Sequence, residues 1–238
     1  MNRFWRSGAA VALAVLAAAG CDRLRRPPAV KPPDPLWAQF LAGHTVGIVS
    51  RKTKIAVRFA VDVFDKERVG QEAPGVLEFD PSVRGTATVS DPREVVFIPA
   101  EDLTPGAYYK VTVRRKALAN LPDKLDDYEF VFQTLPRTFE VEIGGLTAED
   151  TAGLMALAGV VTTADGEEAE PVEKVVFPQW SGAPLQVTWT HDAEGRRHEF
   201  TVRGLKREAD AQSLHVNWYG GPLGVENRGE RTVEIPGL

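Results

Sequence analysis

The chain has 238 residues, of which 43% are hydrophobic and 26% are charged, and its formal net charge is −5 at pH 7. This composition is ordinary for a globular protein and offers no basic face, so we expect no binding to nucleic acid. A single cysteine, Cys21, excludes a framework of intramolecular disulfides.

The first residues follow the order of an export signal. Arg3 and Arg6 precede an apolar run over residues 9–17, and small residues then lead to Cys21. The run is shorter than the roughly 20 residues of a membrane-spanning helix, and small residues before a cysteine favour cleavage next to it. We therefore expect residues 1–20 to be a cleaved signal peptide.

The end of this segment resembles the lipobox of bacterial lipoproteins, although Ala18 stands where leucine is usual. The resemblance implies that Cys21 carries acyl chains such as palmitate and holds the chain to a membrane of the bacterial cell envelope, facing the periplasm. Two or three acyl chains, at about 0.8 kcal/mol per buried CH₂, are sufficient for stable anchoring. Asp22, the next residue, favours retention at the inner membrane. A plain signal peptide followed by an unrelated cysteine is the alternative.

Residues 21–40 combine this cysteine with a proline-rich linker. The composition from Asp22 to Leu36 shifts to Arg, Lys and Pro, and repeated prolines favour polyproline II at about 3.1 Å per residue. The pattern predicts a semi-rigid tether between the membrane and the folded part.

Residues 41–136 predict an antiparallel β-sandwich of the immunoglobulin kind. Within 54–61, Ile55, Val57 and Phe59 fall on one face of a strand and Lys54 and Arg58 on the other, which is period two. Further runs of this kind, separated by Pro and Gly, cover residues 76–79, 85–89, 95–98, 109–113 and 128–132.

One local pattern is more specific than the alternation. The segment from Leu103 to Tyr109 resembles the Leu-x-Pro-Gly-x-x-Tyr corner of immunoglobulin-like sandwiches, in which the tyrosine hydroxyl bonds to upstream backbone. We therefore expect Tyr109 to be a structural residue.

Residues 137–238 show the same alternation of apolar and polar residues, with turn residues between the runs, and predict a second β-sandwich module. Alternating runs cover residues 139–143, 185–189, 200–202, 214–218 and 233–235, with turn signals between them. Only residues 146–157 have the composition of a helical turn. The linker 135–137 between the modules is short.

The sequence shows no recognisable catalytic, cofactor or metal site. His44, His191, His198 and His215 lack the spacing of zinc ligands, and residues 191–198 fit a hairpin better. Ser181 has no Gly-x-Ser-x-Gly context and is expected in a turn. Three aspartates, Asp123, Asp126 and Asp127, lack the spacing of a calcium loop, so an acidic turn is the preferred interpretation.

Two tryptophans are the candidates for recognition. Trp180 and Trp218 stand beside glycine-rich turns, where large aromatic side chains often anchor interfaces. Packing of both rings against the sandwich is the alternative.

Several strings, including residues 44–50, 85–88, 96–99 and 103–106, resemble a bacterial Ig-like domain of the SbsA type. The order of lipobox, tether, this domain and a second β module is similar to the N-terminal modules of bacterial alpha-2-macroglobulin-like lipoproteins. That family traps proteases through a bait region, often with a Cys-Gln thioester. Apart from Cys21 the chain has no cysteine, so the resemblance implies a part or a relative of such a protein, without a thioester or a visible bait region.

The sequence therefore favours a non-catalytic envelope lipoprotein that acts as a binding or scaffold module for an envelope protein partner. A cell-wall or polysaccharide-binding accessory protein is the alternative, suggested by Trp180 and Trp218. A hydrolase has no positive support from any motif.

Overall fold

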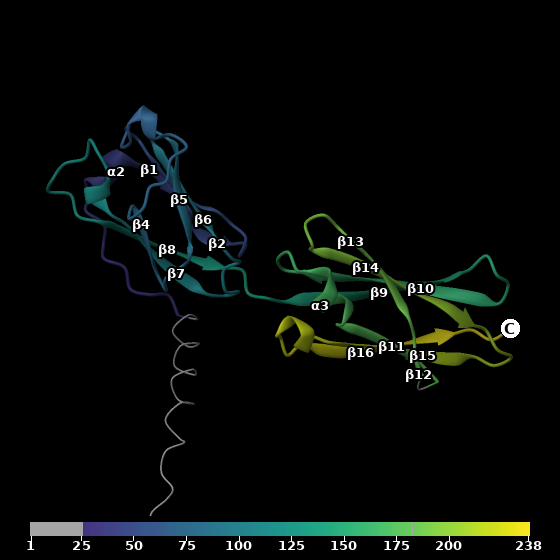
Figure 1. The fold of residues 1–238 in the computed structure, drawn as a ribbon. Coiled ribbons are helices and arrows are strands. Elements are labelled where there is room, and N and C mark those ends of the chain that lie inside the picture. The colour runs from purple at the N-terminus through teal and green to yellow at the C-terminus, as the bar shows by residue number, and fades with distance from the viewer. Residues whose placement is uncertain (1–25, 182) are drawn as a thin grey trace, which may run out of the picture. The chain divides into compact units, whose positions relative to one another are not determined.

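A computed structural model describes residues 26–181 and 183–238 of the chain (Figure 1). Cys21 and Asp22 lie outside the described residues, as does the expected signal peptide. The chain divides into two compact units, one ending at Leu135 and the other beginning at Pro136. Regular structure in both units is almost entirely β-strand, so the predicted all-β class is confirmed.

Unit 1 is a sandwich of two four-stranded sheets. One sheet has the order β1-β3-β6-β5 and the other β2-β8-β7-β4. All pairs are antiparallel except β2 with β8. The elements are α2 (Trp37–Phe40), β1 (Leu41–His44), β2 (Gly47–Val49), β3 (Ile55–Phe59), β4 (Leu77–Asp80), β5 (Gly85–Asp91), β6 (Glu94–Pro99), β7 (Tyr108–Val113), β8 (Tyr128–Thr134) and the 3₁₀ turns Lys66–Arg68 and Arg115–Ala117.

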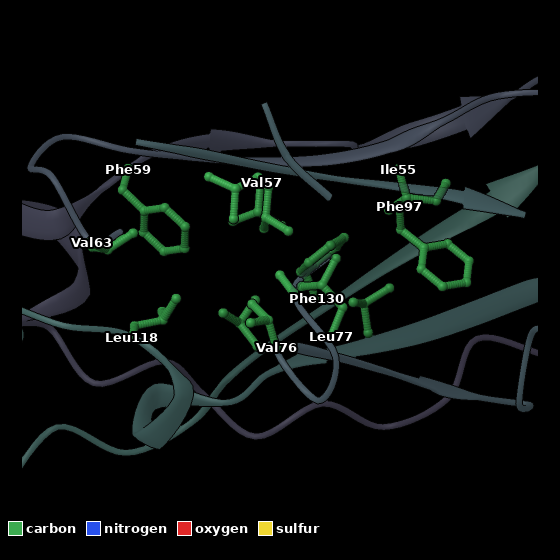
Figure 2. Close-up of a cluster of buried hydrophobic side chains, with 14 of the residues drawn as sticks. Ile55, Val57, Phe59, Val63, Val76, Leu77, Phe97, Leu118 and Phe130 are labelled. Atoms are coloured by element: carbon green, nitrogen blue, oxygen red, sulfur yellow. The ribbon is translucent and has the colours of Figure 1, made fainter. Parts of the chain in front are cut away.

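This strand order is that of an immunoglobulin-like sandwich. Lettered along the chain as A, A′ and B to G, the strands form one sheet A-B-E-D and a second sheet A′-G-F-C, as in that fold. The alternating residues of β3 face the core: Ile55, Val57 and Phe59 are buried, whereas Arg58 is exposed. Figure 2 shows these side chains opposite Leu77 of β4 and Phe130 of β8, in the second sheet.

The folded part of unit 1 includes the end of the expected tether. Trp37 is 2% exposed, packs in the core of unit 1, and its Nε1–H donates to the carbonyl of Asp126 at 3.0 Å. Its ring lies 5.4 Å from that of Tyr128. Further upstream, the backbone N–H of Lys31 donates to Glu129 at 2.9 Å. Composition alone placed this segment in the linker, whereas Trp37, with Leu36 and Phe40 beside it, packs the segment against the core of unit 1.

Tyr109 makes the corner contact described for such domains. Its side chain is 4% exposed on the core side of β7, and its hydroxyl accepts a hydrogen bond from the backbone N–H of Thr104 at 3.0 Å. The ring stacks on Phe132 with centroids 5.3 Å apart. The bond ties the loop before β7 to the strand itself, so Tyr109 has a structural role.

Unit 2 is a second sandwich, with sheets β13-β14-β10-β9 and β12-β11-β15-β16. Every pair in it is antiparallel. The elements are β9 (Phe139–Ala148), β10 (Leu154–Thr163), α3 (Ala169–Glu173), β11 (Val176–Trp180), β12 (Ala183–Pro184), β13 (Val187–His191), β14 (Arg197–Lys206), β15 (Gln212–Tyr219), a 3₁₀ turn (Gly221–Leu223) and β16 (Arg228–Ile235).

The segment expected to carry a helical turn, residues 146–157, is instead the end of β9, a turn and the start of β10. Pairing between the ten-residue strands β9 and β10 prevails over the local helical composition, because each strand gains backbone partners and a side-chain face against the core. The short helix α3, which follows β10, had no clear signal in the sequence.

We expect Tyr109→Phe to destabilise unit 1 by about 1–2 kcal/mol, because the substitution leaves the Thr104 N–H without its partner while keeping the ring. Chemical denaturation followed by fluorescence measures the change. Tyr108→Phe is the matched control, since Tyr108 lies half-buried on the opposite face of β7. Equal stability of the Tyr109 variant and wild type would contradict the role of the corner.

Candidate aromatic cleft

Two aromatic side chains point outward from the second sheet of unit 2. On β11 and β15 the inward positions hold buried Val176, Leu214 and Val216, as alternation requires. Outward positions of a half-buried sheet are normally polar. Phe177 and Tyr219 occupy such positions and are 44% and 49% exposed.

The strand register brings these two rings together with polar side chains. Phe177 lies opposite Asn217, which lies opposite Glu230, and Tyr219 lies opposite Arg228. With Trp218 and Gly229, these residues line a cleft of about 410 Å³. The cleft therefore combines two outward aromatic rings with one cation, one carboxylate and one amide, and Trp218, which also lines it, stands at an inward position like Leu214 and Val216.

Two glycines allow the rings of the cleft to take their positions. A Cβ at Gly221 would collide with the Tyr219 ring, and a Cβ at Gly229 would collide with the Trp218 ring. Each ring therefore lies directly against backbone. Such contacts restrict rotation of the side chains before any partner arrives, which reduces the entropy lost on binding.

The structure separates the two tryptophans singled out in the sequence. Trp218 lines the cleft and also packs partly against the core. Trp180 pairs with Leu214 at the other end of β11, packs against the core, and its buried Nε1–H has no hydrogen-bond partner in the described chain. The sequence analysis did not select Phe177 or Tyr219. Tyr219 could have been placed on the outer face, because residues 214, 216 and 218 alternate on the inner face of the same strand.

A chain of three side chains joins the β13–β14 hairpin of unit 2 to the end of α3. His191 and His198 are directly opposite each other on β13 and β14, as the expected hairpin requires, and their Nδ1 atoms are 2.8 Å apart. His191 Nε2 lies 3.0 Å from Glu173 Oε1 at the end of α3. The Trp189 ring lies parallel to the His191 imidazole, with centroids 6.1 Å apart.

Burial lowers the pKa of His198, because a fully buried imidazole loses the hydration of its charged form. The charge of protonated His191 lowers this pKa further. The Gly195 carbonyl and the carboxylates of Asp192 and Glu167 act in the opposite direction, and burial prevails.

Unit 1 carries a charged groove of about 450 Å³ on the outer side of β4 and β7. Its three cations are paired: Lys31 with Asp126 at 2.6 Å, Lys110 with Glu129 at 3.4 Å, and Arg114 with both Glu78 and Asp127. The hydrogen bond from Arg114 holds the pKa of Glu78 below its ordinary value. The groove is thus a set of ion pairs at the surface, of which the exposed ones contribute little to stability.

The remaining candidates from the sequence have structural partners. Asp123 pairs with Arg115 at 2.7 Å, so all three aspartates of the acidic turn face a cation. Ser181 has a φ of 50° and follows β11, which is a turn position. Within residues 26–181 and 183–238, no group of three or more His, Cys, Asp or Glu side chains is arranged to hold a metal ion.

No helix in the described part of the chain is long and apolar enough to cross a membrane.

No protein-family model matches the sequence, and a search among curated proteins found no match. Among solved structures, bovine butyrophilin is 13% identical, covering 86% of this chain and 96% of its own, with a TM-score of 0.31. A titin fragment, A168–169, is 9% identical over 81% of this chain and 94% of its own, with a TM-score of 0.29. The mouse nectin-like molecule 4 ectodomain is 13% identical over 80% of this chain and 65% of its own, with a TM-score of 0.32. The strand order of each sheet, given above, defines the fold.

Proposed function

We propose that this chain is a non-catalytic binding module that recognises a protein partner through the aromatic cleft of unit 2. The observation that carries the proposal is the exposure of Phe177 and Tyr219 on the outer face of a sheet. Exposed aromatic rings of this size, gathered around one cleft, are typical of interaction sites.

The residue types of the cleft favour a protein over other ligands. Aromatic residues and arginine are enriched among the side chains that dominate protein interfaces, and the cleft holds Phe177, Trp218, Tyr219 and Arg228. Asn217 and Glu230 add an amide and a carboxylate that fix the orientation of a bound backbone or side chain.

A polysaccharide is the second candidate ligand, because aromatic faces flanked by Asn217, Arg228 and Glu230 also suit a sugar ring with its hydroxyls. In that case Trp218, which lines the cleft, would contact the ligand, whereas Trp180 lies at the other end of β11.

We further propose that the module is held to the cell envelope through a lipid on Cys21, with Asp22 as an inner-membrane sorting signal. The order of basic residues, apolar run, small residues and cysteine supports this proposal. A relation to the N-terminal modules of alpha-2-macroglobulin-like proteins belongs to the same proposal. It is supported by two sandwiches that follow a proline-rich segment.

We expect the double substitution Phe177→Ala and Tyr219→Ala to weaken partner binding at least ~30-fold, since each truncated anchor costs about 1–2 kcal/mol or more. The measurement is a pull-down from envelope extract with the immobilised chain, followed by affinity determination for each retained protein. The exposed Ile98 and Val69 of unit 1 provide the matched control, Ile98→Ala with Val69→Ala.

Equal retention of partners by the double variant and wild type would remove the cleft from the proposal. If the wild-type chain retains no envelope protein but sediments with peptidoglycan or a polysaccharide, and the double variant does not, the ligand is a glycan.

We expect Cys21→Ala to move the chain from the membrane fraction to the soluble fraction, because the substitution removes the thiol that would carry the acyl chains. Fractionation of cells expressing each variant measures this. Ala18→Leu, which restores the usual lipobox residue, should leave the chain at the membrane. Unchanged membrane association of the Cys21 variant would refute the anchor.

A further inference from the structure

The strand β16 forms one side of the aromatic cleft and is also an edge of its sheet. It is the last strand in the order β12-β11-β15-β16, and no further strand lies beside it in the described part of the chain. Arg228, Gly229 and Glu230, which line the cleft, all belong to this strand. The cleft is therefore bordered by a strand whose outer side has no neighbour in the sheet.

Two hydrogen bonds show which backbone groups of β16 point to the free edge. The Tyr219 N–H donates to the Val175 carbonyl on the β11 side at 2.9 Å, whereas the Gly220 N–H donates to the Asn227 carbonyl on the β16 side at 2.7 Å. These directions alternate along an antiparallel ladder, so residues 229, 231, 233 and 235 bond to β15. The N–H and C=O groups of residues 228, 230, 232 and 234 therefore point to the free edge.

The other edge strands of the described chain are less suited to accept a further strand. β12 has two residues, β2 has three, and β1 and β4 have four each, while β13 has five. The ladders of β5 and β9 contain register shifts, and such irregularities hinder edge-to-edge pairing. β16 pairs eight residues with β15 without a shift and contains no proline. It therefore offers the longest regular edge.

The free edge carries exposed charges without partners. Arg228, Glu230 and Glu234 point to the outer face of the sheet, and Arg231 alternates with them on the inner side. None of these four side chains forms an ion pair within residues 26–181 and 183–238, unlike the cations in the groove of unit 1. A strand added here would place its side chains directly opposite them, where opposite charges stabilise and like charges destabilise the pair.

The charge pattern argues against a second copy of this chain as the added strand. An antiparallel β16–β16 pair centred on Glu230 places Glu230 against itself, and one centred on Thr232 places Glu230 against Glu234. The register centred on Arg231 pairs Arg228 with Glu234, but it brings Arg231 against Arg231 of the other copy at a closely spaced, non-hydrogen-bonded position. A segment of different sequence can satisfy all of these charges.

We propose that the partner of this module contributes an extended segment that joins β16 as a fifth, antiparallel strand. Its outward side chains include basic residues opposite Glu230 and Glu234, and an acidic residue faces Arg231. An apolar side chain at its end lies opposite Arg228, beside the ring of Tyr219 in the cleft. The inference rests on the proposed function, because it specifies the kind of protein segment that the cleft recognises.

A synthetic peptide with this pattern tests the proposal directly. The probe is the capped heptapeptide Lys-Val-Thr-Glu-Lys-Val-Phe, which places lysines opposite Glu234 and Glu230 and its glutamate opposite Arg231. We expect its addition to the full-length ¹⁵N-labelled chain, up to about 5 mM, to shift the backbone amide resonances of residues 228–234. The charge-reversed peptide Glu-Val-Thr-Lys-Glu-Val-Phe should bind at least about tenfold more weakly, since three charge pairs become repulsive.

Thr232→Pro separates strand addition from simple surface contact. The Thr232 N–H points to the free edge, so proline removes a donor for the added strand without removing a bond to β15. We expect at least about tenfold weaker binding of the probe. Thr232→Ala is the matched control, because it removes the same hydroxyl, which lies 3.3 Å from His215 Nδ1, and keeps the N–H. It should bind the probe as wild type does.

A second variant tests the charges without a change in the backbone. Glu230→Lys with Glu234→Lys should reverse the preference between the two peptides. Absence of amide shifts with the first peptide, equal affinity of Thr232→Pro and Thr232→Ala, or an unchanged preference in the lysine variant would overturn strand addition. Shifts of the same amides on raising the concentration of the chain alone would assign the edge to a second copy instead.

The pull-down from envelope extract distinguishes this inference from the proposed function. If Phe177→Ala with Tyr219→Ala loses the retained proteins but Thr232→Pro keeps them, the cleft binds a partner and strand addition is wrong. If both variants lose them and Thr232→Ala keeps them, the partner uses the cleft and the edge together.

Discussion

Each strand in both units has one face that must be buried against a second sheet, and the rest of the structure depends on this constraint. In unit 2 it places Phe200 and Val202 of one sheet in the same core as Leu214 and Val216 of the other. Since the inward positions are fixed by burial, the outward ones are free to carry function. Phe177 is therefore evidence for a binding role of the outer face, because nothing in the packing of the core requires an aromatic residue at that position.

The same constraint determines how much of the fold could be predicted from the sequence. Strands with strict alternation, such as β3 and β15, were predicted from their period. β10 was missed, because its run Leu154–Thr163 contains adjacent apolar residues and a register shift after Met155. β11 was missed for another reason: Pro178 within it argues against a strand that has neighbours on both sides.

The candidate site was predictable only in part. Trp218 was selected by size and by the neighbouring glycines, and it does line the cleft. Phe177 and Arg228 come from strands on either side of β15, so only the register places them beside Tyr219. The hairpin between residues 191 and 198 was predicted from the sequence, but the contact of His191 with Glu173 was not. That contact depends on α3, whose position is set by burial of Val172 and Val175.

A sandwich core does not need an imidazole pair. His198 shares its face of β14 with Phe200 and Val202, where an apolar side chain would fill the same space without a titratable group. Apolar contacts between two sheets are non-directional and insensitive to pH. The Glu173–His191–His198 chain instead adds a directional contact between the β13–β14 hairpin and the end of α3.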